Sequence, residues 1–369
     1  MSAQNTINNF IKESNTALQS KISKDKKNIL FISYYSTYRK HYGELVSKLK
    51  DKYNVITIVD RILNDDFEKA GHFNMLFPWR VIENGETYYL NMEIEGIDLI
   101  ITADQVGYED GKIDKEFLSK SAKRVYLPHA LFLKTGDSCL VDYICVSSKI
   151  AMSDYQKNKN TKCKFLATGY PKLDFAIKNY RYTDKNMITY APNLRDTSAD
   201  RNGNLNQIAG FDNNMIEWLL ENTSYRVSYR AHPYNSLNNH INYHLIKQKW
   251  KNNHRVVFDE SLGNAYNDYS DFMISDCTAG YTYSFSTLRP SFFFQPNYNI
   301  DFKQREMTEI LSGGSLARSF KELKAQITNI DYKAIAEGIK DLRDREIYNV
   351  GHSEEVIIGY VDEILEGKL

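Results

Sequence analysis

Arginine and histidine alternate at the end of one strand-like run, "RVSYRAHPYNS", which spans residues 226–236. Arg230 and His232 project to the same side of an extended chain because strand side chains alternate with a period of two. Pro233 cannot continue a central strand, so the strand ends where these groups lie. A guanidinium beside an imidazole suits a phosphate or a developing oxyanion. A histidine in an ordinary surface turn is the alternative, and the spacing leaves both open.

A second run, "FMISDCTAGYTYSF", ends a strand and begins a helix within a few residues. Ser275 and Asp276 close the apolar strand, and Thr278 and Ala279 open the predicted helix. The free amides of a helix N-terminus, together with hydroxyl groups, form an anion site. Simple helix capping by Asp276 or Thr278 is equally compatible with the sequence.

The N-terminal half contributes a third polar strand end, "YLPHALFLKTG", in which His129 follows an apolar run. A histidine there is either a general base projecting into a cleft or a packed structural residue. His240 and His244 have i,i+4 spacing but lack the glutamate of a zinc protease motif and a third ligand. The four cysteines are scattered without a CxxC pair. We therefore predict no metal, no disulfide and a reducing, cytoplasmic location.

Composition narrows the class of protein further. Lysine plus arginine and aspartate plus glutamate both total 47 in 369 residues, so the protein has no net positive charge that would attract nucleic acid. We find no secretory signal and no apolar run of membrane-spanning length. Residues 1–24 carry apolar side chains near helical spacing and predict an amphipathic helix that packs on the body of the protein. Contact of that helix with the inner face of the plasma membrane is the alternative.

Two series of apolar strands alternate with helix-length segments along the chain. The first includes "NILFISYYS", "IDLIITAD" and "DYICVSS", and the second includes "NMITYAPN", "HRVVFDE" and "PSFFFQ". This pattern is typical of parallel sheets covered on both faces. We predict an α/β protein of two Rossmann-type domains, 25–180 and 181–335, facing a central cleft, with C-terminal helices over 336–369 that cross back. Ligands of such sheets bind beyond the carboxyl ends of the strands, where the polar motifs lie.

Taken together, "ATGYPKLD", "ITYAPNLRD", "YRAHP" and "MISDCTAGYTYSFSTLRPSFFF" resemble, in order and approximate spacing, motifs of the CDP-glycerol glycerophosphotransferase family. The resemblance covers about residues 120–300. Family members have the two-domain GT-B architecture and transfer a polyol phosphate from a CDP-polyol without a compulsory metal. The resemblance therefore implies a GT-B-like fold, a nucleotide-activated donor that is CDP- or CMP-linked, and no required cofactor.

The resemblance also implies roles for individual residues. The family's catalytic-base motif falls on His129 and Lys134, whereas the residues between them depart at Ala130, Leu131 and Phe132. Its arginine-x-histidine-proline motif falls on Arg230, His232 and Pro233, and its nucleotide loop falls on Asp276, Cys277, Thr278 and Ala279. The predicted catalytic residues are His129 and His232. The predicted nucleotide- and phosphate-binding residues are Arg230, Ser275, Asp276, Thr278, Ala279, Pro192 and Gly169, with Lys134, Arg195, Glu260 and Asp104 as secondary candidates.

The function predicted on this basis is that of a transferase in the synthesis of a cell-surface polymer such as teichoic acid or capsule. It would move glycerol phosphate, or a related polyol phosphate, to a saccharide or lipid-linked acceptor. A glycosyltransferase with a CMP- or UDP-activated sugar is the first alternative. A nucleotide-sugar epimerase would need carboxylates in the cleft, for which Asp104, Glu260 and Asp276 are candidates. A non-catalytic binding subunit is the third alternative, and the oligomeric state is left open.

Overall fold

The computed structural model of the protein describes most of the chain and divides it into two compact units. The described residues are 9, 12–13, 15–33, 41–59, 74–76, 80–83, 86–89, 94–103, 119–129, 131, 141–157, 163–183, 186–193, 211–232, 235–236, 241–260, 270–295 and 302–369. Unit 1 consists of Met1–Phe175 and Ile347–Leu369, and unit 2 of Ala176–Glu346. The chain thus leaves unit 1 once and returns to it near the C-terminus.

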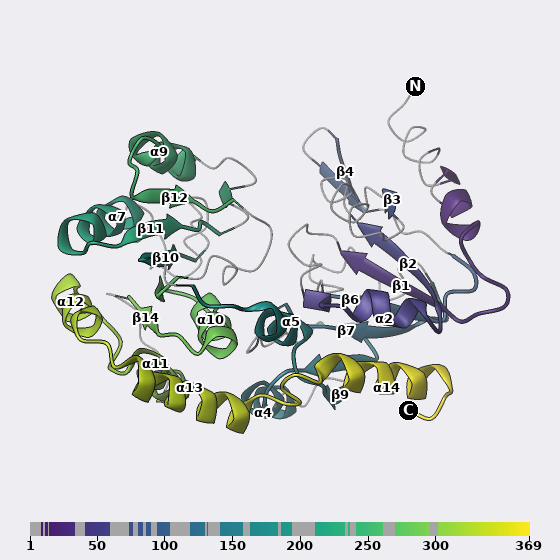
Figure 1. Ribbon diagram of the computed structural model, residues 1–369. Helices are drawn as coiled ribbons and strands as arrows, with labels where there is room; N and C mark the ends of the chain where they lie inside the picture. Colours follow the sequence, from purple (N-terminus) through teal and green to yellow (C-terminus); the bar gives the residue numbers. More distant parts are fainter. Residues whose placement is uncertain are drawn as a thin grey trace. The chain divides into compact units, whose positions relative to one another are not determined.

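Unit 1 is built on a seven-stranded parallel sheet in the order β3-β2-β1-β6-β7-β8-β9 (Figure 1). Its strands are β1 (Asn28–Ser33), β2 (Asn54–Val59), β3 (Asn74–Leu76), β6 (Leu99–Thr102), β7 (Lys123–Tyr126), β8 (Tyr143–Val146) and β9 (Lys164–Ala167). Helices of this unit are α2 (Leu45–Lys50), α4 (Lys149–Lys157), α5 (Pro171–Asn179), which crosses the unit boundary, and α14 (Ser353–Leu365). An antiparallel pair, β4 (Arg80–Glu83) and β5 (Glu86–Tyr89), forms a separate small sheet that the sequence pattern did not predict.

Both faces of the first sheet are covered, which explains why its strands are continuous apolar runs. On one face Phe31 and Ile101 pack with Ile357 and Val361 of α14. On the opposite face Tyr126, Ile144 and Val146 pack with Ala151 and Tyr155 of α4. Burial of this apolar surface, at about 25 cal/mol per Å², is the main force that holds the C-terminal helix to unit 1.

Unit 2 contains a five-stranded parallel sheet in the order β12-β11-β10-β13-β14. Its strands are β10 (Met187–Ala191), β11 (Arg226–Tyr229), β12 (Val256–Phe258), β13 (Phe272–Ser275) and β14 (Ser291–Phe293). Its helices are α7 (Phe211–Asn222), α9 (Ile241–Trp250), α10 (Ala279–Thr287), α11 (Phe302–Ser312), α12 (Phe320–Thr328) and α13 (Tyr332–Glu346). The parallel sheets of both units confirm the predicted α/β class.

Alternation along β13 shows how the second sheet is buried from both sides. Phe272 and Ile274 join the core that contains α7, α9 and α12. Met273, between them, points to the other face and meets Tyr283 of α10. Because both faces are covered by helices, charged side chains such as Arg230 and Asp276 lie beyond the strand ends, whereas small hydroxyl side chains such as Thr189 are buried within the sheet.

The C-terminal residues are divided between the two units. Helix α13 packs with α10 and α11 in unit 2, whereas Ile347–Leu369 belong to unit 1. After the crossing, Asp174 of α5 accepts hydrogen bonds from the backbone amides of Gly351 and Ser353, both at 2.7 Å. These bonds fix the chain at the start of α14.

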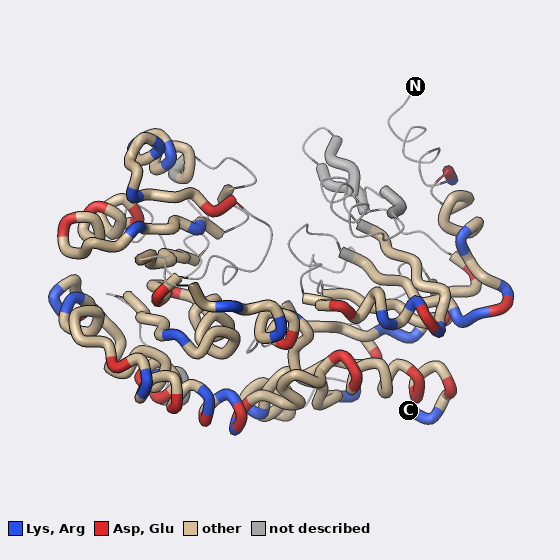
Figure 2. The backbone as a smooth tube through the Cα atoms, viewed as in Figure 1, with Lys and Arg blue, Asp and Glu red and all other residues tan. Residues whose placement is uncertain are grey.

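Charge is interspersed rather than segregated on the described surface. Figure 2 shows acidic and basic residues mixed along α13, in keeping with the equal totals of the sequence. At the other end of the chain, Leu18 is fully buried and Gln19 exchanges hydrogen bonds with the backbone of Glu95. The described end of the predicted N-terminal helix therefore packs on unit 1. Within the described residues, no helix combines the length and the apolar character that crossing a membrane requires.

Candidate functional site

The order in which the chain adds strands to the second sheet reverses between β10 and β13. The predicted nucleotide-binding residues follow these two strands. β10 is the first strand of this sheet in the chain and lies between β11 and β13. From β10 the chain adds β11 and β12 on one side and later β13 and β14 on the other side. Ligands of open parallel sheets bind outside such a point. Here the Asp276 carboxylate, just after β13, accepts a 2.6 Å hydrogen bond from the amide of Asn193, just after Pro192 and β10. This bond joins two of the predicted motifs at one sheet edge.

The side chains at the start of α10 differ in what they contact. Thr278 is exposed and makes no capping hydrogen bond, although it occupies the N-cap position. Ser275 is buried, donates to the carbonyl of Ala191 at 2.7 Å and accepts from the amide of Cys277 at 3.2 Å. Asp276 bonds Asn193 instead of capping the helix. The turn is thus held by Ser275 and Asp276, and Thr278 presents its hydroxyl group to solvent at the helix N-terminus.

Arg230 lies at the carboxyl end of β11 and is oriented by a buried carboxylate. Its guanidinium forms an ion pair with Asp259, which follows β12, and both side chains are only 7% exposed. Tyr229 and Phe258 are partners in the register of the two strands, so the next residues along each strand are Arg230 and Asp259. A guanidinium carries five N–H donors, and the pair with Asp259 fixes the direction of this fork.

His232 and Glu260 follow β11 and β12 at the same end of the second sheet. His232 is half-buried, and its carbonyl accepts a 2.8 Å hydrogen bond from the amide of Asn235. Glu260 pairs with Lys247 at 2.6 Å and accepts a hydrogen bond from Tyr243, and the lysine lowers the pKa of its carboxyl group. A lowered pKa makes Glu260 a weak general base.

His129 of unit 1 follows β7 and contacts two buried residues, His41 and Tyr170. The hydroxyl group of Tyr170 donates to the carbonyl of His129 at 3.0 Å and lies 2.8 Å from Nδ1 of His41. The imidazole rings of His41 and His129 contact edge to face, with centroids 5.9 Å apart. His41 and Tyr170 are both 3% exposed, whereas His129 is half-buried. The backbone of His129 is thus held by Tyr170, and its ring is contacted by His41.

Gly169, predicted to bind phosphate, lies in unit 1 beside this group. Its φ of +87° and the 2.4 Å separation between an added Cβ and the carbonyl of Tyr348 give it a local reason to be glycine. Lys134, Arg195 and Asp104 lie outside the described residues. Among those the structure does describe, no three His, Cys, Asp or Glu side chains gather as metal ligands would.

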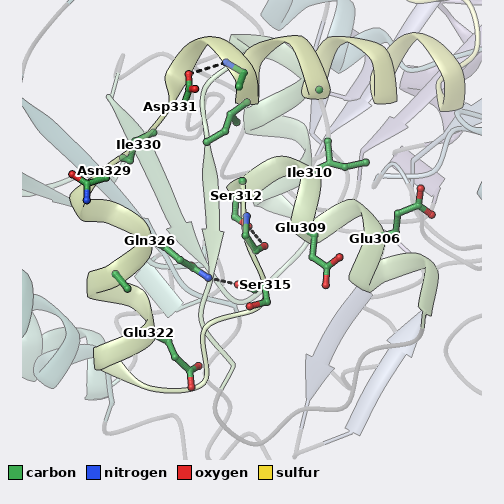
Figure 3. A pocket seen from close by; sticks show the side chains of 16 residues that line it. Glu306, Glu309, Ile310, Ser312, Ser315, Glu322, Gln326, Asn329, Ile330 and Asp331 are labelled. Atoms are coloured by element: carbon green, nitrogen blue, oxygen red, sulfur yellow. Dashed lines mark hydrogen bonds between the residues drawn. The ribbon is translucent and has the colours of Figure 1, made fainter.

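A groove of about 810 Å³ lies in unit 2 among α11, α12 and α13 (Figure 3). Two of its carboxylates accept hydrogen bonds from backbone amides at helix starts: Glu322 from the amide of Arg318, and Asp331 from the amide of Ala334. A third, Glu306, lies 3.6 Å from Arg345. None of the residues predicted from the sequence lines this groove, and its acidic character follows largely from helix capping and pairing.

Comparison with known proteins assigns the chain to a family. Residues 14–349 match the profile of CDP-Glycerol:Poly(glycerophosphate) glycerophosphotransferase. The chain belongs to this family. It is therefore a transferase, and the resemblance inferred from the motifs is confirmed. No curated protein sequence matched the chain.

Solved structures with a similar fold include both transferases and epimerases. A histidine-to-asparagine variant of the wall teichoic acid polymerase TagF, soaked with CDPG, is 13% identical, with 99% of this chain and 96% of that chain covered and a TM-score of 0.59. The MnaA–UDP complex of S. aureus is 14% identical over 92% and 97%, with a TM-score of 0.62. A UDP-N-acetylglucosamine 2-epimerase from Listeria monocytogenes is 11% identical over 93% and 97%, with a TM-score of 0.60. At these identities the likeness concerns the fold alone, and it confirms the predicted GT-B-like class, while the predicted central cleft stays a prediction.

Four residues that contact the predicted ones escaped the sequence reasoning. They are Asn193, Asp259, His41 and Tyr170. Asp259 had a usable signal, because it directly follows a strand, "VVFDE", whose carboxyl end must lie at the same edge as that of β11. His41 had none, since it lies in a short turn well beyond β1.

Proposed function

We propose that the protein transfers glycerol phosphate from CDP-glycerol to a hydroxyl group of a saccharide or polymer acceptor. The family match over residues 14–349 carries this proposal. The strand-end residues of unit 2 supply a chemically suitable nucleotide site, and His129 in unit 1 supplies a base. A sugar nucleotide remains the alternative donor in chemical terms, but no observation on the described residues favours it over the family's substrate.

In the proposed reaction, the acceptor oxygen attacks the β-phosphorus of CDP-glycerol. A new oxygen–phosphorus bond forms, the bond from the β-phosphorus to the bridging oxygen breaks, and CMP leaves with that oxygen. The proton of the acceptor hydroxyl passes to the imidazole of His129. The reaction needs no change of oxidation state, and the groups named here account for every bond and proton.

We propose that unit 2 binds the nucleotide through its pyrophosphate. Arg230, oriented by Asp259, donates charge-assisted hydrogen bonds to the phosphate oxygens. The Thr278 hydroxyl and the first amides of α10, including that of Ala279, add donors at a helix N-terminus. His232 stabilises charge on the leaving group, whereas Ser275 holds the turn from within the protein.

The test is the release of CMP, UMP or UDP from a panel of donors, with CDP-glycerol beside a CDP-linked polyol and UDP-N-acetylglucosamine. We expect CDP-glycerol to be turned over and CMP to stabilise the protein in a thermal-shift titration, since a ligand that binds only the folded state raises its stability. Turnover of UDP-N-acetylglucosamine with no release of CMP from CDP-glycerol would exclude the proposed donor.

The role of His129 is tested by replacing it with alanine. His129→Ala should lower turnover by about 10²- to 10⁴-fold, the usual contribution of a general base, and leave the affinity for CMP nearly unchanged. His254→Ala, at an exposed position of unit 2, is the matched control and should keep its turnover. A His129→Ala enzyme with normal turnover would assign the base to another residue.

We further propose a cytoplasmic location. Cys145 is a buried thiol, which suits a reducing compartment. Peripheral contact with the inner membrane face would bring the enzyme to a lipid-linked acceptor. Sedimentation of the full chain with anionic lipid vesicles at low and high salt tests this contact.

A further inference from the structure

We propose that His41 and Tyr170 are positioning residues that hold His129 in the orientation required of a base. The inference rests on the proposed role of His129 and adds to it two side chains, 129 positions apart in the sequence, that touch each other. All three residues lie in unit 1.

The hydrogen bonds fix where the protons lie in this group. A carbonyl can only accept, so the single hydroxyl proton of Tyr170 is directed to the carbonyl of His129. At its 2.8 Å contact with His41 the phenol oxygen then accepts, which places a proton on Nδ1 of His41. The tautomer of His41 is thereby set by the bond that anchors His129.

The chain around His129 is anchored on both sides by groups from neighbouring strands. The amide of Leu127 donates to the carbonyl of Thr102 at 2.8 Å. The hydroxyl groups of Ser147 and Ser148, after β8, donate to the carbonyl of Leu131 at 2.6 Å and 3.3 Å. Tyr170 supplies the donor between these two anchors, at His129 itself.

Tyr42 places the adjacent His41 at the point where the strand order of the first sheet reverses, between β1 and β6. The hydroxyl group of Tyr42 donates to the carbonyl of Ile32 at 2.5 Å and accepts from the amide of Ala103 at 3.0 Å. It therefore bridges the carboxyl ends of β1 and β6, which are adjacent in the sheet. Ligands of parallel sheets bind at such a point. His41, next in the chain, contacts the ring of His129 there.

A base must lie within hydrogen-bond reach of its substrate proton, and small displacements are costly in rate. Tyr170→Phe keeps the aromatic ring but removes the hydroxyl group that bonds His129 and His41. We expect it to lower kcat about 10- to 100-fold, with the KM for CDP-glycerol within about twofold of the wild type. Tyr53→Phe is the matched control, because it also removes a tyrosine hydroxyl bond, to Asp362, but at the opposite end of the sheet.

Two replacements of His41 separate positioning from packing. His41→Leu fills space without a donor and should lose kcat as Tyr170→Phe does. His41→Asn places an amide N–H near the position of Nδ1 and should recover part of that loss. A wild-type kcat in both Tyr170→Phe and His41→Leu would overturn the proposal, and so would a His41→Asn enzyme no faster than His41→Leu.

The double variant His129→Ala/Tyr170→Phe decides whether Tyr170 acts through His129. If it does, the double variant is no slower than His129→Ala, because effects within one catalytic unit are not additive. A further 10-fold loss in the double variant would refute the positioning role while leaving His129 as the base. Normal turnover in His129→Ala alone would instead refute the base on which the proposal depends.

Discussion

Replacement of Arg230 tests the structural basis of the nucleotide site more directly than any other change. The guanidinium of Arg230 and the carboxylate of Asp259 form an ion pair in which each side chain is 7% exposed. Arg230→Ala leaves a buried carboxylate without its cation. Breaking a buried pair in this way costs about 3–5 kcal/mol of unfolding free energy. We therefore expect Arg230→Ala to destabilise unit 2 by that amount, in addition to any loss of nucleotide affinity.

Removal of both charges gives the opposite expectation. In Arg230→Met/Asp259→Leu no charge remains buried, and replacement of a buried pair by apolar groups of similar volume is often neutral or stabilising. The double variant should thus regain most of the stability that Arg230→Ala loses. An exposed pair on α13, Lys340 and Asp344, provides the control: Lys340→Ala should cost less than about 1 kcal/mol.

Urea denaturation of these variants, followed by tryptophan fluorescence, measures the difference. A Trp79→Phe background confines the signal to Trp218 and Trp250, both in unit 2. If Arg230→Ala loses no more stability than Lys340→Ala, the buried pair does not carry the expected free energy. Arg230→Lys, which keeps the charge but not the planar fork, should be nearly as stable as the wild type and bind CMP about 1.5–3 kcal/mol more weakly.

Three further predictions follow from single positions. Gly169→Ala should destabilise the protein by more than about 2 kcal/mol, because the positive φ and the carbonyl of Tyr348 exclude a Cβ; an unchanged melting temperature would contradict this. Burial raises the pKa of the Cys145 thiol to about 12, so native protein at pH 8 should leave it unlabelled by iodoacetamide in a mass-spectrometric assay. Labelling as fast as in urea would show that the thiol is accessible. Lys247 lowers the pKa of Glu260, so this pair adds stability that is fully present above pH 4.5 and is lost as the pH falls through the lowered value. Both side chains are exposed, so Glu260→Gln should cost under about 1 kcal/mol at pH 7, and less than that at pH 3. A loss of stability in Glu260→Gln that is larger at pH 3 than at pH 7, read from urea midpoints, would contradict this prediction.

The sequence by itself determined the class of fold and predicted which strand ends carry the site. Continuous apolar runs of strand length, alternating with helices, are typical of parallel sheets buried on both faces, so charged residues are expected beyond the strand ends. Arg230, Asp276 and His129 were found in this way, because each directly follows such a run. The order and spacing of these motifs also sufficed to indicate the family.

Only the tertiary structure decided which strand-end residues meet. Arg230 and Asp259 are 29 positions apart, Asn193 and Asp276 are 83 apart, and His41 and Tyr170 are 129 apart. A hydrogen bond acts over about 3 Å, so strand order and register determine these pairs, and neither can be read from local periodicity. The same limit applies to helix α14, whose apolar face fits many surfaces and whose actual partner, the first sheet, is selected by packing across the whole of unit 1.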